Sequence, residues 1–414
     1  MNNLSYLDQF KGLNRQVYLI CICRIIMGMG SMSYAFMSIH LRSILGLSEV
    51  GIGWVNVAVA IFSVTGGLVG GRLADIYGRK LVCVSAYGLQ IATHIISIFL
   101  CRHRIMILLM VMANFFSMMG YPVFAAMVSD SSDPQRSKES FSLMYLCSNI
   151  GVAIGPSIGG LLFYNHLELT YVVQAVFVGA GILFFALTTK ENYSRQDAFR
   201  AARTAVLEEG TQKDDSEKSL LRVVIEHKLL LVFVASLAVV SICYQMVNFM
   251  LSMQTTDLFG LEISSKYCGF VWTTNGIVIV LLTPLLLTFT KRNHHFVNMA
   301  LGVVLYAIGY GSYSFMKHPI MVVVGAVIWT VGEILISTGA GAFIASNSPK
   351  SHVARCQSLY ETARQVGKAA GPLLFGYLLS FISYNSAWRI NSAICILVGI
   401  WVYFSWKKAG CPKE

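Results

Sequence analysis

Charged residues are scarce in this sequence. Only 12% of its 414 residues are Asp, Glu, Lys or Arg, whereas soluble domains carry about 25%. Hydrophobic residues make up 56%, so too few polar residues are left to coat a water-soluble protein of this length. The sequence therefore predicts an integral membrane protein whose solvent is lipid.

The period-two alternation of a membrane barrel is also missing. Instead, twelve apolar runs of roughly 20 residues are long enough to cross a hydrocarbon core. Lipid offers no partner to an exposed backbone amide, so each run should be a helix. We expect an all-α membrane protein with 12 transmembrane helices. They lie near residues 17–41, 50–71, 81–101, 105–128, 142–164, 170–189, 229–252, 268–290, 296–316, 319–347, 357–380 and 385–406.

Motifs of enzymes and metal sites are absent as well. The 10 cysteines and 9 histidines show no ligand-like spacing, and there is no phosphate loop or nucleophile elbow. We therefore expect no metal, no cofactor and no enzyme activity. No cleavable signal peptide is evident, so the first span should stay in the protein.

The net charge of +11 would suit a nucleic-acid-binding protein, but the positions of the basic residues indicate membrane topology. With both termini and the even-numbered connections on one side, 22 of the 31 Lys and Arg lie there, six lie on the other side and three lie inside spans. The positive-inside rule then places both termini in the cytoplasm. We expect a monomeric, multi-pass protein of a bacterial inner or plasma membrane, with no nucleic-acid partner.

A polar segment divides the spans six and six. Residues 190–228 hold 16 of the 51 charged residues, so we predict a cytoplasmic linker there. The predicted domains on either side are a six-helix bundle at 1–189 and a second one at 229–414.

The two halves are similar to each other in sequence. At a constant offset, residues 142–163 and 358–379 are identical at eight of 22 positions, including Gly151/Gly367 and the following Gly-Pro pair. The fifth span therefore matches the eleventh, which is the register of two parallel six-helix pseudo-repeats.

Four charges occupy the turn "GGRLADIYGRK" between the second and third spans. Gly71, Asp75, Gly78, Arg79 and Lys80 in this turn resemble the loop between helices 2 and 3 of the major facilitator superfamily, and the helix count, repeat and linker extend the resemblance to the whole chain. It implies the major facilitator fold, with Asp75 and Arg79 holding the cytoplasmic gate shut. The alternative is a solvated basic turn that only sets topology.

A second motif lies in the fifth span. Gly151, Gly155, Pro156 and Gly159, within "GVAIGPSIGG", resemble the helix 5 antiporter motif of the same superfamily. Pro156 removes a backbone donor, so the helix should bend. The resemblance implies an exporter of the 12-helix drug:proton antiporter branch, although Phe116 stands where that branch usually has Arg. The alternative is a kinked helix of the kind that any facilitator has.

Ionisable residues inside spans cost about 2.5–3.5 kcal/mol each on insertion scales, so each needs a reason. Glu333 lies mid-span among apolar neighbours, where a carboxyl can gain and lose a coupling proton. Glu361, Arg364 and Lys368 share one face of the eleventh span and should line the central cavity. We predict Glu333, Asp130 and Glu361 as proton-coupling residues.

Each of these assignments has an alternative. Glu333 can be the structural partner of a basic residue, Glu361 and Arg364 can satisfy each other, Arg24 can snorkel to the headgroups, and Asp130 can be an ordinary helix-end acid. The predicted substrate-cavity residues are Arg24, Tyr34, Asn149, Tyr244, Trp272, Asn275, Arg364, Gln365 and Lys368.

Together these features predict a secondary active transporter that works by alternating access. The first reading is a proton-coupled antiporter that exports small amphiphilic compounds or drugs. The alternative is a proton-coupled uptake symporter for a small organic anion or peptide, which the three intramembrane cations support. A third reading is a membrane sensor that binds its ligand without moving it. The expected partners are a small-molecule substrate, protons and the lipid bilayer.

Overall fold

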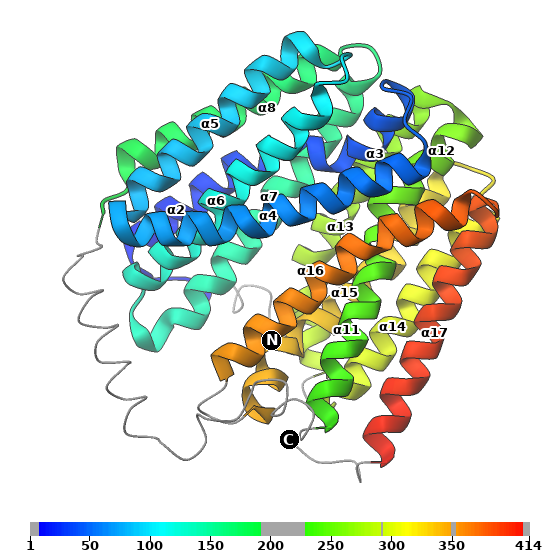
Figure 1. Cartoon of the computed structure of the whole chain (residues 1–414). Coiled ribbons are helices and arrows are strands. Elements are labelled where there is room, and N and C mark those ends of the chain that lie inside the picture. The colour runs from blue at the N-terminus through cyan, green and yellow to red at the C-terminus, as the bar shows by residue number, and fades with distance from the viewer. Residues whose placement is uncertain (1–7, 192–227, 291–292, 349–352, 409–414) are drawn as a thin grey trace. The chain divides into compact units, whose positions relative to one another are not determined.

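A computed structural model describes residues 8–191, 228–290, 293–348 and 353–408, and within these ranges every regular element is a helix. The first half of the sequence contains α2 (Arg15–Met29), α3 (Ser33–Ser43), α4 (Glu49–Tyr77), α5 (Arg79–Leu100), α6 (Met106–Ser131), η1 (Pro134–Arg136), α7 (Ser137–Phe163) and α8 (Leu167–Thr188). The second half contains α11 (Lys228–Met246), η2 (Val247–Leu251), α12 (Ser252–Phe259), α13 (Leu261–Thr290), α14 (His295–Ser312), η3 (Tyr313–Phe315), α15 (Ile320–Asn347), α16 (Val353–Leu379) and α17 (Tyr384–Lys408) (Figure 1).

The all-helical membrane fold is confirmed. Among the described residues, 11 helical segments are long and apolar enough to cross a membrane. The remaining predicted span, 357–380, is also helical, and all of it except residue 380 lies in α16, whose charged residues lower its hydropathy. Apart from residues 190, 191 and 228, the predicted linker lies outside the described residues.

The first predicted span differs from a single continuous helix. It is broken between α2 and α3, where Gly30 caps α2. The Ser31 hydroxyl donates a hydrogen bond to the Gly28 carbonyl (2.6 Å). A local side-chain bond of this kind competes with the helical ladder, so the apolar run continues while the helix does not.

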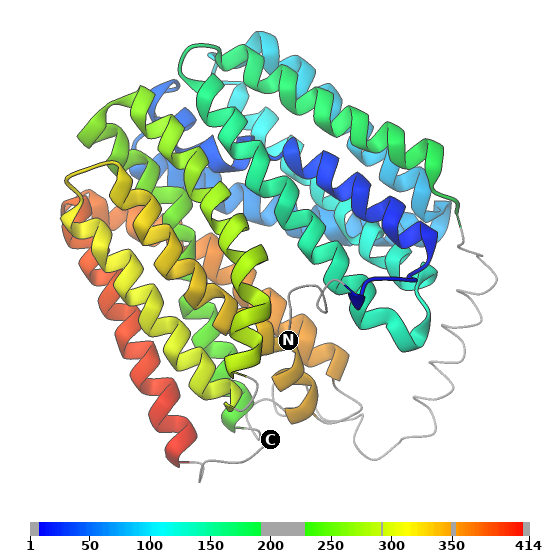
Figure 2. The same cartoon turned by 180° about the vertical axis from the view of Figure 1, so that it is seen from behind.

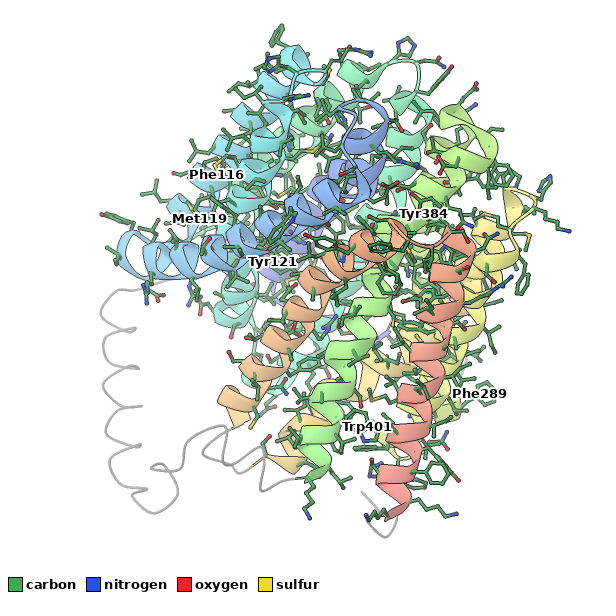
Figure 3. The ribbon with its side chains drawn as sticks, turned by 45° about the vertical axis from the view of Figure 1, so that its right-hand side comes forward. Phe116, Met119, Tyr121, Phe289, Tyr384 and Trp401 are labelled. Carbon is green, nitrogen blue, oxygen red and sulfur yellow. The ribbon has the colours of Figure 1, made fainter. Side chains whose placement is uncertain are left out.

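Large apolar side chains cover helix surfaces that would be polar in a soluble protein. Phe99, Leu187 and Phe381 are each at least 76% exposed, and Phe289 projects from α13 (Figure 3). Extended apolar surface of this kind suits contact with lipid rather than water.

The chain forms two compact units that do not follow the sequence halves throughout. Of the described residues, unit 1 comprises 8–48, 55–191 and 252–280, and unit 2 comprises 49–54, 228–251, 281–290, 293–348 and 353–408. The start of α4 and the end of α13 therefore belong to unit 2, whereas α12 belongs to unit 1. The predicted domain boundaries at 189 and 229 stay a prediction.

The same helix pairings recur in the two units. In unit 1, α2 packs on α7 and α8, and α5 packs on α6 and α8; Figure 2 shows α2, in dark blue, beside α7. In unit 2, α11 packs on α16 and α17, and α14 packs on α15 and α17 (Figure 1). When the spans are numbered along the chain, each helix pairing in unit 2 matches a pairing in unit 1 with both numbers raised by six. This match confirms the two six-helix pseudo-repeats.

The similar glycines of the repeat have similar packing roles. A Cβ added to Gly151 on α7 would lie 2.5 Å from the Ile25 carbonyl oxygen and 2.8 Å from the Gly28 Cα on α2. A Cβ added to Gly367 on α16 would meet the Ala238 carbonyl of α11 even more closely. In both units a glycine lets two helix backbones touch, as is common in membrane bundles.

Polar side-chain contacts hold α12 in unit 1 and the start of α4 in unit 2, although most of the described residues in each of these units come from the other half of the sequence. In unit 1, the Arg42 guanidinium on α3 binds both carboxylate oxygens of Asp257 on α12 (2.9 and 3.1 Å) and the Met253 carbonyl (3.1 Å). In unit 2, the hydroxyl of Tyr384, which Figure 3 labels, donates to Glu49 at the start of α4 (3.1 Å). Such side-chain bonds stabilise these short segments within their units.

Candidate substrate and proton site

A small polar cavity lies inside unit 2. Its volume is about 100 Å³, and side chains of four helices line it: α11, α14, α15 and α16. The lining side chains are Leu237, Val240, Ser241 and Tyr244 on α11, Tyr306 on α14, Glu333, Ile336 and Ser337 on α15, and Tyr360, Arg364 and Lys368 on α16. Four residues singled out from the sequence, Tyr244, Glu333, Arg364 and Lys368, thus line one cavity.

The helical period explains how α16 supplies its part of the wall. Tyr360, Arg364 and Lys368 follow at intervals of four, so their side chains lie above one another on one side of the helix. The Arg364 guanidinium donates to the Tyr360 hydroxyl (3.2 Å) and lies 5.4 Å from the centroid of its ring. The Lys368 ammonium lies 5.7 Å from the centroid of the Tyr244 ring on α11.

Glu361 lies next to this cavity but does not line it. Arg364 donates to its carboxylate at 3.2 Å, and the Glu361 side chain is 58% exposed. Glu361 stands three residues before Arg364 and is not among the lining side chains, although its neighbour Tyr360 is. The structure therefore separates Glu333, which lines the cavity, from Glu361, which pairs with Arg364 from outside it.

The remaining intramembrane cation, Arg24, lies in unit 1. Its Nε donates to the Ser148 hydroxyl on α7 (3.3 Å). Its guanidinium carbon is 4.9 Å from the ring centroid of Tyr121, which Figure 3 labels, and 5.3 Å from that of Phe124; both rings belong to α6. Cation–π contacts of this length are attractive, so Arg24 is held among α2, α6 and α7.

The other predicted cavity residues occupy separate places. Tyr34 is on α3 and half-exposed, and the Asn149 amide donates to the Tyr145 carbonyl of its own helix (2.8 Å). Trp272 and Asn275 are on α13, where Asn275 is buried, and Gln365 is on the exposed side of α16. None of these five lines the unit 2 cavity, and their role as substrate contacts stays a prediction.

Sequence reasoning missed several side chains of the cavity wall. Tyr306 is buried on α14, and Tyr360, Ser241 and Ser337 complete the polar lining. The position of Tyr360, one turn before Arg364, was a usable signal. No sequence signal distinguished Tyr306, because tyrosines in apolar spans commonly pack against neighbouring helices.

The charged turn between α4 and α5 is built around Arg79. Its guanidinium forms an ion pair with Asp130 at the end of α6 and donates to the Ala126 carbonyl (2.7 Å). Lys80 uses its backbone N–H to bind Glu191 (2.6 Å) and its ammonium to bind the Thr189 carbonyl (2.7 Å).

Two glycines and an acid complete this turn. Gly78 has a φ of +97°, a conformation that favours glycine. Gly71 lies on α4, where a Cβ would have open space around it. Asp75 is exposed in the last turn of α4, and its gate role stays a prediction.

The Arg79–Asp130 pair gives a test of this turn. Arg79→Gln should lower the free energy of unfolding by about 1–3 kcal/mol, because it leaves a partly buried carboxylate without its charged donor. Asp75→Asn changes an exposed group and should lower stability less, while slowing transport if Asp75 belongs to the gate. Denaturation of the two purified variants measures their stability, and a transport assay measures their rates. Equal losses of stability in the two variants would contradict the role of the Arg79–Asp130 pair.

Comparison with known proteins matches this arrangement to one family. The family model described as Major Facilitator Superfamily matches residues 20–367 and 298–413. A multi-drug resistance efflux pump PmrA homolog of Lactococcus lactis is 22% identical, with 82% of this chain and 80% of that protein covered. A Na(+), Li(+), K(+)/H(+) antiporter of Planococcus maritimus is 21% identical, with coverage of 86% and 88%.

Other relatives give the same family. An uncharacterized MFS-type transporter of Bacillus subtilis is 23% identical, with coverage of 88% and 87%. Among solved structures, a crystal structure of the peptide transporter POT superposes with a TM-score of 0.79 at 16% identity, over 97% of this chain and 96% of that chain. At such low identity the likeness concerns the fold. The chain is a multi-pass membrane transporter that belongs to the Major Facilitator Superfamily.

Proposed function

We propose that this chain is a proton-coupled secondary transporter in which Glu333 carries the coupling proton. The observation that carries the proposal is the position of Glu333: it lines a polar cavity together with Arg364 and Lys368 inside a membrane-spanning unit. An ionisable residue at membrane depth is costly and usually functional. A carboxylate beside two cations can change its charge, and with it the charge of the cavity.

Export by proton antiport is the first candidate for the direction of coupling. The names of two relatives support it, one an efflux pump homolog and one a cation/proton antiporter. The motif of Gly151, Gly155, Pro156 and Gly159 also supports it, because it resembles the helix 5 motif of exporters in the same superfamily. In this candidate, a small amphiphilic compound leaves as a proton enters.

Uptake of a small organic anion by proton symport is the second candidate, and the charge of the cavity favours it. Arg364 and Lys368 outnumber Glu333 in the cavity wall. Protonation of Glu333 makes the wall more positive, which favours an anion and disfavours a cation by Coulomb's law. The anion would then bind to the protein while Glu333 carries the proton, so that both move together, as symport requires.

Transport by proteoliposomes separates the two candidates. An imposed pH gradient is applied, and radiolabelled organic anions and cations are followed together with internal pH. Movement of substrate against the proton flux identifies antiport, and movement with it identifies symport. Substrate fluxes that neither respond to the pH gradient nor change internal pH would contradict proton coupling altogether.

A further inference from the structure

The unit 2 cavity is too small for a whole substrate but suits one charged group. Ligand pockets for drug-sized molecules span roughly 300–1,000 Å³, whereas this cavity holds about 100 Å³. That space accommodates a carboxylate and a few carbon atoms. The cavity is therefore an anchoring subsite for part of a substrate.

The charges around the cavity lie on several helices. The titratable groups that face Lys368 are Tyr244 on α11, Tyr306 on α14, Glu333 on α15, and Tyr360, Glu361 and Arg364 on α16. Arg364 is already engaged, because it donates to both the Tyr360 hydroxyl and the Glu361 carboxylate. Among the described residues that line the cavity, Glu333 is the one carboxylate, and its charge acts on Lys368.

These positions make the net charge of the cavity depend on one proton. With Glu333 ionised, the charges of Glu333, Glu361, Arg364 and Lys368 sum to zero. With Glu333 protonated, they sum to +1 in a partly desolvated site. Buried charges are stable only when paired, so the protonated site calls for an external anion.

We propose that Lys368 anchors an anionic group of the substrate, a carboxylate, and that this group replaces the Glu333 carboxylate as the counter-ion of Lys368 when Glu333 is protonated. The proposal rests on the proposed role of Glu333 as the proton site and selects the symport candidate. Tyr244 and Tyr306 supply aromatic faces beside the anchored group. The substrate class that follows is a small organic acid with an aromatic or aliphatic body.

Binding to the purified full-length chain tests the substrate class. Benzoate, benzylamine and benzyl alcohol share one ring and differ in charge, and thermal stabilisation reports their binding. Over about pH 6 to 8 the carboxylate stays ionised and the amine stays protonated. We expect stabilisation by benzoate but not by benzylamine. Stabilisation by benzylamine alone, or by none of the three probes, would overturn the proposal.

The pH dependence has a defined sign. An anion that binds only the Glu333-protonated state has an apparent affinity reduced by the protonated fraction. The benzoate affinity of the wild-type chain should therefore fall as pH rises, by up to about tenfold per pH unit once Glu333 is mostly ionised. A benzoate affinity that rises with pH would contradict the shared binding of proton and anion.

Matched variants assign these effects to residues. Lys368→Met should weaken benzoate binding roughly thirtyfold or more, as expected when one partner of a buried charge pair is truncated, and Lys368→Arg should retain part of it. Lys266→Met is the control, because Lys266 pairs with Glu262 in an exposed i,i+4 bridge. Unchanged benzoate binding by Lys368→Met would overturn the anchor.

A second pair of variants separates this proposal from the proposed function. Glu333→Gln should bind benzoate with the low-pH affinity at every pH, whereas Glu262→Gln, which removes the carboxylate of the exposed bridge to Lys266, should keep the wild-type pH dependence. If benzoate binding needs Lys368 but keeps its pH dependence in Glu333→Gln, the anchor stands and the proton role of Glu333 falls. If Glu333→Gln uncouples flux while benzoate never binds, the proton role stands and the anchor falls.

Discussion

Glu333→Gln is expected to lose proton-driven accumulation completely while it still exchanges substrate across the membrane. A pH difference of one unit supplies about 1.4 kcal/mol per proton, enough to concentrate a substrate about tenfold. Glutamine keeps the size and polarity of the side chain in the cavity but cannot release a proton. The variant should therefore reach equal concentrations on both sides, whatever the pH gradient.

The measurement is radiolabelled uptake into proteoliposomes, with counterflow at equal pH as the second readout. Glu262→Gln is the matched control, because it makes the same change of side chain in an exposed bridge to Lys266 outside the cavity. It should retain accumulation. Normal coupled acidification by Glu333→Gln would move the proton site away from Glu333.

Gly151→Ala is expected to destabilise unit 1 by about 1–3 kcal/mol, the usual range for overpacking. The added methyl would lie 2.5 Å from a backbone carbonyl of α2, and a backbone cannot rotate away as a side chain can. The two helices would have to separate, which loosens the contacts between α2 and α7. Gly367→Ala should have a similar effect on α11 and α16 in unit 2.

Gly88→Ala is the control for both glycine variants. Gly88 also lies within a membrane-spanning helix, α5, but a Cβ there has nothing within 4 Å. Because alanine favours helix more than glycine by about 1 kcal/mol, this variant should be at least as stable as the wild type. Thermal unfolding of the purified proteins measures all three, and equal stability of Gly151→Ala and Gly88→Ala would contradict the packing role.

Much of the site was predictable from the sequence because charge is so rare inside a membrane. Glu333, Arg364 and Lys368 stand out among apolar residues, and the spacing of Arg364 and Lys368 already placed them on one side of α16. The structure brings these three into one cavity. Tyr244 was also anticipated, as a polar aromatic residue, although the sequence did not distinguish it from other aromatic side chains such as Trp272.

The partners of the charged residues were harder to predict from the sequence. Glu361 has nearly the same direction on α16 as Lys368, yet it is exposed and does not line the cavity, whereas its neighbour Tyr360 does. Arg79 was predicted to act with Asp75, and the structure shows it paired with Asp130 of α6 as well as bound to Ala126. The contact of Arg79 with α6 depends on how α5 packs against α6, which the sequence does not show; the predicted gate role of Asp75 stays a prediction.

The sequence by itself determined that the protein lies in lipid, that its spans are helical and that its two halves repeat. Lipid requires every backbone amide to be satisfied within its own segment, so the length and apolarity of each run determine a helix without reference to its neighbours. The tertiary structure decided which side chains meet. The rotation and contact of each helix are set by its partners, as Gly151 and Gly367 illustrate. Only that packing joins Tyr306, Glu333 and Lys368 into one site.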